Sequence, residues 1–180
     1  MELHKVKKEV VYKVGRNVLL FQQMEGVLKY LVSHGNIAGT ATELKPKFDK
    51  QKQSVSKRTL GMVVGDFLDG TTQPPEPEKL TEVYFSFSFE TEVDEDLKAE
   101  IEELVAERNN LIHHFFAEVE VESLDSWLNA SDRLDAQEVK LGRVIENLRK
   151  IAQTLSDGRK ALADFMTTEE FKQRLLGDPS

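Results

Sequence analysis

The chain has 180 residues, 39% of them hydrophobic, which is enough to bury a core and predicts a single domain over residues 1–180. It has no cysteine, which excludes a disulfide framework and a thiolate metal site. The net charge of −8 argues against broad, non-specific nucleic-acid binding but permits a local basic surface. No apolar run approaches the ~18 residues of a membrane span, and the N-terminal stretch lacks the apolar centre of a signal peptide, so we expect a cytoplasmic protein without membrane contact.

Residues 8–33 are predicted to form the first long helix, because apolar side chains recur there at three- and four-residue steps. The stretch His34-Gly35-Asn36 then provides a stop signal. Asn17 and Glu25 lie on or near the apolar face, where either could meet Arg108 of a later helix, although we favour a solvated position at the edge. The apolar face consists of Val10, Val14, Phe21, Met24, Leu28 and Leu31.

A basic segment follows this helix. Residues 35–53 are predicted to be a loop or a loosely helical connection, because Gly35, Gly39 and Pro46 interrupt them. Between residues 45 and 58 the cations are opposed only by Asp49, which suggests a local surface for RNA phosphates; the alternative is an exposed lysine-rich loop. The candidate RNA-binding residues are Lys45, Lys47, Lys50, Lys52, Lys57 and Arg58.

A short helix is predicted over about residues 55–68, and the Gly- and Pro-rich residues 69–77 then break the pattern. Residues 83–90 alternate apolar and polar side chains, which is the period of a β-strand. We therefore expect a short extended or β insert near residues 82–90. Because a lone strand leaves its backbone unpaired, it must pair with an extended piece of a preceding loop or with its own copy in a dimer. The alternative is an extended segment that lays its Phe rings over the helices.

Residues 94–119 are predicted to form a long amphipathic helix with one unusual position in its apolar seam. The seam residues are Leu97, Ile101, Leu104, Leu111 and Phe115. Arg108 occupies the remaining seam position. An arginine in an apolar seam is costly to desolvate unless it is paired, so it requires a partner or a functional role. Asn109 and His113 are expected close together on the flank beside the seam.

The rest of the chain is also predicted to be helical. A second long helix spans about residues 124–155, residues 156–158 could bend or break it, and the capping-box pattern of residues 167–170 begins a last short helix that ends near Gly177. The seam of the long helix is Leu134, Leu141, Ile145, Leu148, Ala152 and Leu155. These elements predict an all-α fold, an up-and-down bundle of four to five helices with a short β insert.

The stretch RNNLIH, residues 108–113, has the spacing R-N-x-x-x-H late in a long helix of an all-helical chain. In this it resembles the HEPN domain family, many of whose members are metal-independent ribonucleases that act as toxins or defence effectors. The resemblance implies one HEPN-like helical domain and a homodimer, because in that family two copies of the motif usually meet across the dimer interface. Some toxin members carry, two residues after the histidine, a tyrosine that partner enzymes modify with AMP. Phe115 stands there in this chain, so that modification is excluded at this position.

The resemblance also implies a mechanism that needs neither a metal nor a cofactor. RNA supplies its own nucleophile, the 2′-hydroxyl, so the protein has only to move protons and stabilise charge on the phosphate. By this resemblance His113 is the acid or base, Arg108 binds the phosphate and Asn109 positions one of them. The implied partners are an RNA substrate, a second copy of the chain, and an antitoxin or other protein.

Each of these assignments has a structural alternative. Arg108 could be a buried arginine tied to a carboxylate such as Glu25, and His113 could be an exposed residue at a helix C-terminus. Asn109 and the neighbouring His114 could be plain surface residues. The competing function is then a catalytically inactive HEPN-like helical module that binds protein, nucleotide or RNA. The four histidines have no metal-binding spacing, and the chain has no glycine-rich phosphate loop.

Overall fold

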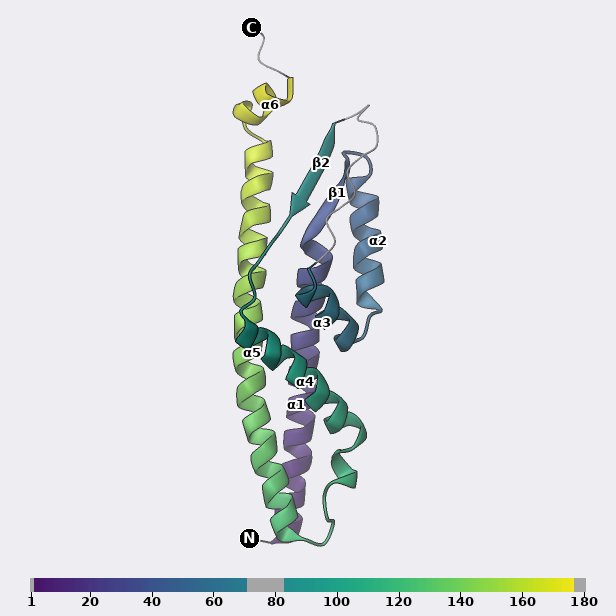
Figure 1. Cartoon of the computed structure of the whole chain (residues 1–180), viewed down its shortest axis with the longest axis vertical. Coiled ribbons are helices and arrows are strands. Elements are labelled where there is room, and N and C mark those ends of the chain that lie inside the picture. Colours follow the sequence, from purple (N-terminus) through teal and green to yellow (C-terminus); the bar gives the residue numbers. More distant parts are fainter. Residues whose placement is uncertain (1, 71–82, 177–180) are drawn as a thin grey trace.

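The computed structural model describes residues 2–70 and 83–176, and most of these residues are helical (Figure 1). The all-α class with a short β insert is confirmed. The prolines of the expected breaker and the expected helix end near Gly177 lie outside the described residues. The elements are α1 (Leu3–His34), β1 (Asn36–Thr40), α2 (Leu44–Ser56), α3 (Leu60–Leu68), β2 (Tyr84–Ser88), α4 (Glu95–His113), the 3₁₀ turn η1 (Phe115–Ala117), α5 (Leu124–Met166) and α6 (Glu169–Leu176).

The two longest helices, α1 and α5, give the molecule its elongated shape (Figure 1). They lie side by side and run in the same direction. Lys13, in the first half of α1, contacts Asp135 in the first half of α5, and His34, at the end of α1, contacts Arg159 near the end of α5. The chain neighbours α1 and α2 reverse direction, as expected for an up-and-down bundle. The segment between α1 and α5 carries the chain back to the starting end, which is why these two helices are parallel.

The helix α4 crosses in front of the α1–α5 pair and runs antiparallel to α5 (Figure 1). Glu100 of α4 pairs with Arg143, and Glu107, two turns later, pairs with Lys140, which precedes Arg143. Asp94 caps the N-terminus of α4, where its carboxylate accepts the Leu97 N–H over 2.7 Å. The helix ends at His113 rather than near residue 119, and η1 continues the chain.

The apolar faces expected from periodicity form the core. All residues of the expected α1 face are buried except Val14, which is half-buried. The four leucine and isoleucine residues of the α4 seam are buried, and Phe115 is buried in η1. Fully burying one such side chain contributes about 1.5–3 kcal/mol, so these faces hold α4 on the helix pair. Within the described residues, no helix has the length and apolar run needed to cross a bilayer.

The partner of the expected strand is β1, which lies in a region expected to be a loop. β1 and β2 are antiparallel, with Asn36 opposite Ser88 and Thr40 opposite Tyr84. Gly39 permits this packing, because a Cβ at this position would lie 3.2 Å from the Cβ of Glu43. Five residues that include a glycine show no clear period, so only the pairing with β2 identifies β1 as a strand.

Three helix boundaries differ from expectation. Of the two alternatives for residues 35–53, a loop or a loosely helical connection, the structure has a regular helix from Leu44, α2, which tolerates Pro46 because its first turn needs no backbone N–H there. The helix expected over residues 55–68 is divided, since Val55 belongs to α2 and α3 starts after the extended residue Thr59. α5 continues through residues 156–158 to Met166. Gly158 costs about 1 kcal/mol in a helix, which the packing of the fully buried Leu155 offsets.

Candidate functional site

Arg108, Asn109 and His113 lie on the last two turns of α4. Arg108 is half-buried at the edge of the seam, whereas Asn109 and His113 are exposed. The Nη1 atom of Arg108 donates to Oδ1 of Asn109 over 3.2 Å. His113 is the last residue of the helix, and its ring centre lies 6.2 Å from that of His114. The structure thus joins Arg108 to Asn109, and within residues 2–70 and 83–176 no direct contact joins either of them to His113.

Arg108 differs from the other half-buried arginines of the described chain. Arg16 and Arg58 pair with carboxylates, and Arg159 donates to the backbone carbonyl of His34. Among the described residues Arg108 has no carboxylate partner, and its one hydrogen bond goes to the side chain next to it. Most of the donors of its guanidinium therefore remain available to a ligand.

The two α1 residues considered as partners of Arg108 make other contacts. Glu25 pairs with Lys29, one turn away, over 2.6 Å. Asn17 is 0% exposed, and its amide donates to the Leu134 carbonyl over 2.8 Å and to Gln137 over 2.9 Å. The expectation of a solvated Asn17 is wrong, because α5 packs over that part of α1, which the periodicity of α1 alone does not reveal.

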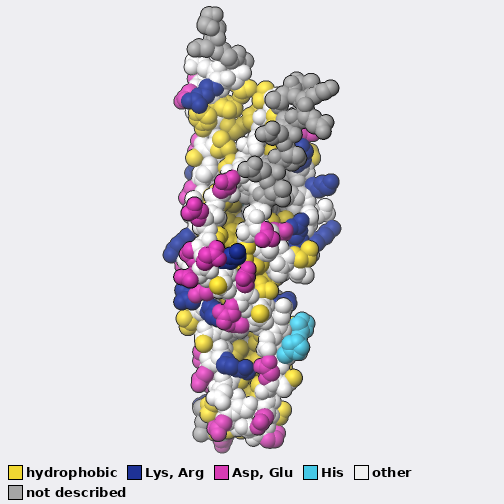
Figure 2. All heavy atoms as spheres, in the orientation of Figure 1, with side chains coloured by type: hydrophobic (Ala, Val, Ile, Leu, Met, Phe, Trp, Pro, Cys, Tyr) yellow, Lys and Arg dark blue, Asp and Glu magenta, His cyan; other side chains and the backbone are white. Residues whose placement is uncertain are grey.

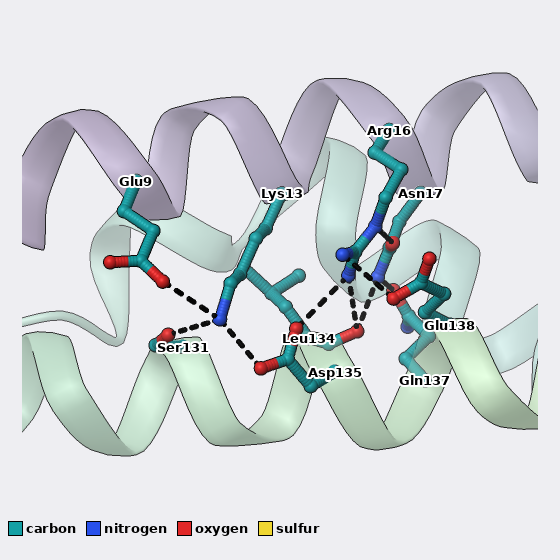
Figure 3. A network of polar contacts seen from close by, with 9 residues as sticks. All are labelled: Glu9, Lys13, Arg16, Asn17, Ser131, Leu134, Asp135, Gln137 and Glu138. Carbon is teal, nitrogen blue, oxygen red and sulfur yellow. Dashed lines mark hydrogen bonds and ion pairs between the residues drawn. The ribbon is translucent and has the colours of Figure 1, made fainter.

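Figure 3 shows the polar network between α1 and α5 to which Asn17 belongs. Nζ of the buried Lys13 lies 2.5 Å from the carboxylate of Asp135 and 2.7 Å from Oγ of Ser131. The hydrogen bond with Asp135 raises the pKa of Lys13 above its usual value, and the same bond lowers the pKa of Asp135. The buried cation is therefore compensated, as a charge in a helix interface must be.

This network extends to the helical turn that carries Arg108. Gln137, which accepts from Asn17, donates through Nε2 to Glu107 over 2.9 Å. Lys140 lies 2.6 Å from the other carboxylate oxygen of Glu107. Burial opposes the charge of Lys140, but its hydrogen bonds with Glu103 and Glu107 outweigh burial and raise its pKa. Glu107 thus fixes the last turns of α4 on α5, and with them the backbone of Arg108.

A hollow of about 650 Å³ lies between α4 and α5 beside these contacts. Its lining includes Glu107, Asn110 and Glu118, but none of the three motif residues. A hydrogen bond from Asn110, and to a smaller extent one from Arg133, lowers the pKa of Glu118. The hollow thus borders the RNNLIH stretch through Asn110 and Leu111, but Arg108, Asn109 and His113 lie outside it. Its own cations, Arg133 and Lys140, are already paired with carboxylates.

The six cations of the basic segment lie on or just after α2, and they fall into two groups. Lys47 pairs with Glu43 over 3.0 Å, and the partly buried Arg58 pairs with Asp66. The other four are exposed and have no carboxylate partner within the described part of the chain. These four are Lys45, Lys50, Lys52 and Lys57.

A cluster that sequence reasoning missed lies at the C-terminal end of α1. The His34 ring stacks on Tyr30 at 4.2 Å and meets the edge of Phe48 at 4.9 Å. Arg159 lies over Phe48 and Phe87 and donates to the His34 carbonyl over 2.9 Å. Burial lowers the pKa of His34. The four-residue spacing of Tyr30 and His34 was the only sign of this cluster in the sequence, because Phe48, Phe87 and Arg159 lie far along the chain from His34.

Comparisons of this chain with family models, curated proteins and solved structures gave no match. The HEPN resemblance therefore rests on the motif and on its place in α4. Among the described residues, no group of three or more His, Asp or Glu side chains is arranged to hold a metal ion.

Proposed function

We propose that this chain is a HEPN-like, metal-independent endoribonuclease of toxin or defence type, with Arg108, Asn109 and His113 in its active site. The observation that carries the proposal is Arg108, a half-buried residue at the edge of the seam whose guanidinium has no ion-pair partner among the described residues. Because the guanidinium is exposed and makes one hydrogen bond there, its planar donors are open to a phosphate. The exposed imidazole of His113, five residues later, is the nearby group suited to proton transfer.

The roles follow from the chemistry of RNA cleavage. The 2′-oxygen forms a bond to the adjacent phosphorus and the bond from phosphorus to the 5′-oxygen breaks, which leaves a 2′,3′-cyclic phosphate and a 5′-hydroxyl. Arg108 binds the phosphate through its planar donors, and Asn109 holds that fork in place. His113 accepts the proton of the 2′-hydroxyl.

The 5′-oxygen needs a proton when it leaves, and a homodimer supplies it from the second copy of His113. Two large apolar side chains beside the motif support such an interface. Ile112 is 45% exposed and Phe116 is 63% exposed. These two side chains supply apolar area that a second copy of the chain would bury.

The competing proposal is a catalytically inactive module of the same kind, which binds a protein, a nucleotide or RNA. It is favoured by the absence, within the described residues, of a contact between Arg108 and His113. An inactive module would keep the surface around the motif for a partner such as an antitoxin and would leave RNA intact.

The test is cleavage of a mixed cellular RNA pool in EDTA by the wild-type protein, His113→Ala and Arg108→Ala. General acid–base catalysis contributes about 10²–10⁴-fold, so we expect His113→Ala to lose at least 100-fold in rate. Arg108→Lys keeps the charge but not the fork and is also expected to lose most activity. His114→Ala is the matched control and should cleave within about twofold of wild type. No cleavage by folded, dimeric wild-type protein, or equal loss in His113→Ala and His114→Ala, would overturn the assignment.

A further inference from the structure

The helix α2 holds its exposed lysines in fixed directions. Its inner side is anchored by Val55, which is 3% exposed, and by Gln51, whose amide donates to the Val32 carbonyl over 3.2 Å. Because these contacts set the rotation of α2, its exposed lysines are held on the flanks of the helix, with Lys50 on one flank and Lys45 and Lys52 on the other. With Lys57, the residue just after α2, these are the four cations of the segment that have no carboxylate partner among the described residues.

Charge is strongly segregated between this segment and the rest of the chain. Residues 45–58 contain six of the 24 Lys and Arg residues and one of the 32 Asp and Glu residues, which gives the segment a charge of +5. Since the net charge of the whole chain is −8, the residues outside this segment together carry a charge of −13. A polyanion is therefore attracted to α2 and repelled by most other surfaces.

The distance between α2 and the motif follows from the contacts that each makes. Lys29 donates to the Ser56 carbonyl, which places the end of α2 level with Lys29 on α1. Glu118 binds Asn110, near the end of α4, and it also binds Arg133 of α5. Arg133 lies two residues before Asp135, which contacts Lys13 of α1. The end of α4 is therefore level with about Lys13.

Sixteen residues of helix separate these two levels, which is about 24 Å at 1.5 Å per residue. α2 and the end of α4 lie toward the same edge of the molecule (Figure 1). Figure 2 shows histidine side chains at that edge below basic side chains over α2. A stacked nucleic-acid strand advances about 3.4 Å per nucleotide, so about seven nucleotides reach from the motif to the near end of α2. α2 extends for a further 13 residues, or about six more nucleotides.

We propose that α2, through the exposed lysines on its flanks, is a docking surface for the RNA strand that runs on from the cleavage site, so that the preferred substrate is an RNA of more than about seven nucleotides. This inference rests on the proposed function for the identity of the ligand. It does not require that the motif be catalytically active, because docking is a property of α2. The main competing occupant of a basic face on an acidic protein is a second copy of the chain.

The test measures binding of fluorescent single-stranded RNAs of 4, 12 and 24 nucleotides by anisotropy, with full-length His113→Ala so that no RNA is cut. The test variant adds Lys45→Gln, Lys50→Gln and Lys52→Gln. The matched control adds Lys8→Gln, Lys150→Gln and Lys160→Gln, which remove the same charge from exposed positions outside α2. Glutamine keeps the helix propensity of lysine, and circular dichroism checks the fold of both variants.

We expect the α2 variant to bind the 24-nucleotide RNA at least tenfold more weakly than its parent, while the 4-nucleotide RNA, which has fewer phosphates to meet the three lysines, loses less affinity. The loss of three phosphate contacts should lower the salt dependence, d log K/d log[salt], by about 2 in magnitude. Equal weakening in the control variant, or equal affinity of the parent for all three lengths, would overturn the docking surface. So would a change of oligomeric state in the α2 variant with unchanged RNA binding, which would assign the face to a second copy.

These results separate the two proposals. Length-dependent binding through α2 in a protein that cuts no RNA would retain the docking surface and reject the nuclease. Cleavage that depends on His113 but is insensitive to the α2 substitutions at every RNA length would retain the nuclease and reject the docking surface.

Discussion

Replacing Asn17 with alanine is expected to destabilise the protein substantially, although the position lies on one face of an ordinary long helix. Asn17 is 0% exposed and donates to the Leu134 carbonyl and to Gln137, while its Oδ1 accepts from Arg16 over 3.1 Å. Alanine removes all three hydrogen bonds and leaves acceptors of α5 facing an apolar methyl group.

The magnitude follows from the burial of these groups. Each lost hydrogen bond costs about 0.5–1.5 kcal/mol, and a buried acceptor left unsatisfied costs about 1–3 kcal/mol. Leu134 keeps a second donor, Nη2 of Arg16 at 3.3 Å, and the partly buried Gln137 can turn toward water, which reduces the total. We expect a loss of about 2–4 kcal/mol in the free energy of unfolding, or a fall of roughly 5–15 °C in Tm for a chain of this size.

Urea unfolding followed by circular dichroism measures this loss as a lower midpoint at an unchanged m-value. Asn109→Ala is the matched control, since Asn109 is exposed and alanine is the better helix former, so no loss is expected. If Asn17→Ala lost less than about 1 kcal/mol, the polar network would not hold α1 against α5, and the account of how α4 is positioned would fail with it.

Two further predictions concern the cluster at the end of α1. Burial lowers the pKa of His34, so the unfolded chain takes up a proton at a higher pH than the folded protein, and stability is lost as the pH falls through the usual value of 6.5. Chemical denaturation between about pH 7 and 5.5 should therefore show a shallower loss in His34→Phe than in wild type, and equal slopes would contradict this reasoning. Arg159→Ala should cost about 1–2 kcal/mol and raise hydrogen exchange in α2 and β2, because it removes the bond to the His34 carbonyl and the contacts with Phe48 of α2 and Phe87 of β2. Lys160→Ala is its control, and equal protection in the two variants would refute the anchoring role.

The local signals in the sequence predicted the elements that bury one face. The 3.6-residue period identified the seams of α1, α4 and α5, and the two-residue period identified β2. The stop after His34 and the start of α4 after Asp94 follow from backbone groups that each helix end leaves unpaired. The sequence also placed Arg108 on the seam and Asn109 and His113 outside it, as the structure has them.

Only the tertiary structure decided which elements meet. The pairing of Asn36 with Ser88, the burial of Asn17 under α5 and the parallel course of α1 and α5 depend on contacts between residues that are far apart in the chain. The lack of a carboxylate partner for Arg108 among the described residues was also decided by the tertiary structure. It depends on which cation each acidic side chain of the neighbouring helices pairs with, as Glu25 does with Lys29. Periodicity reports that a face is buried, since it follows from the geometry of one helix or strand. It does not report what covers that face, because the choice of partner is set by packing and charge compensation over the whole chain.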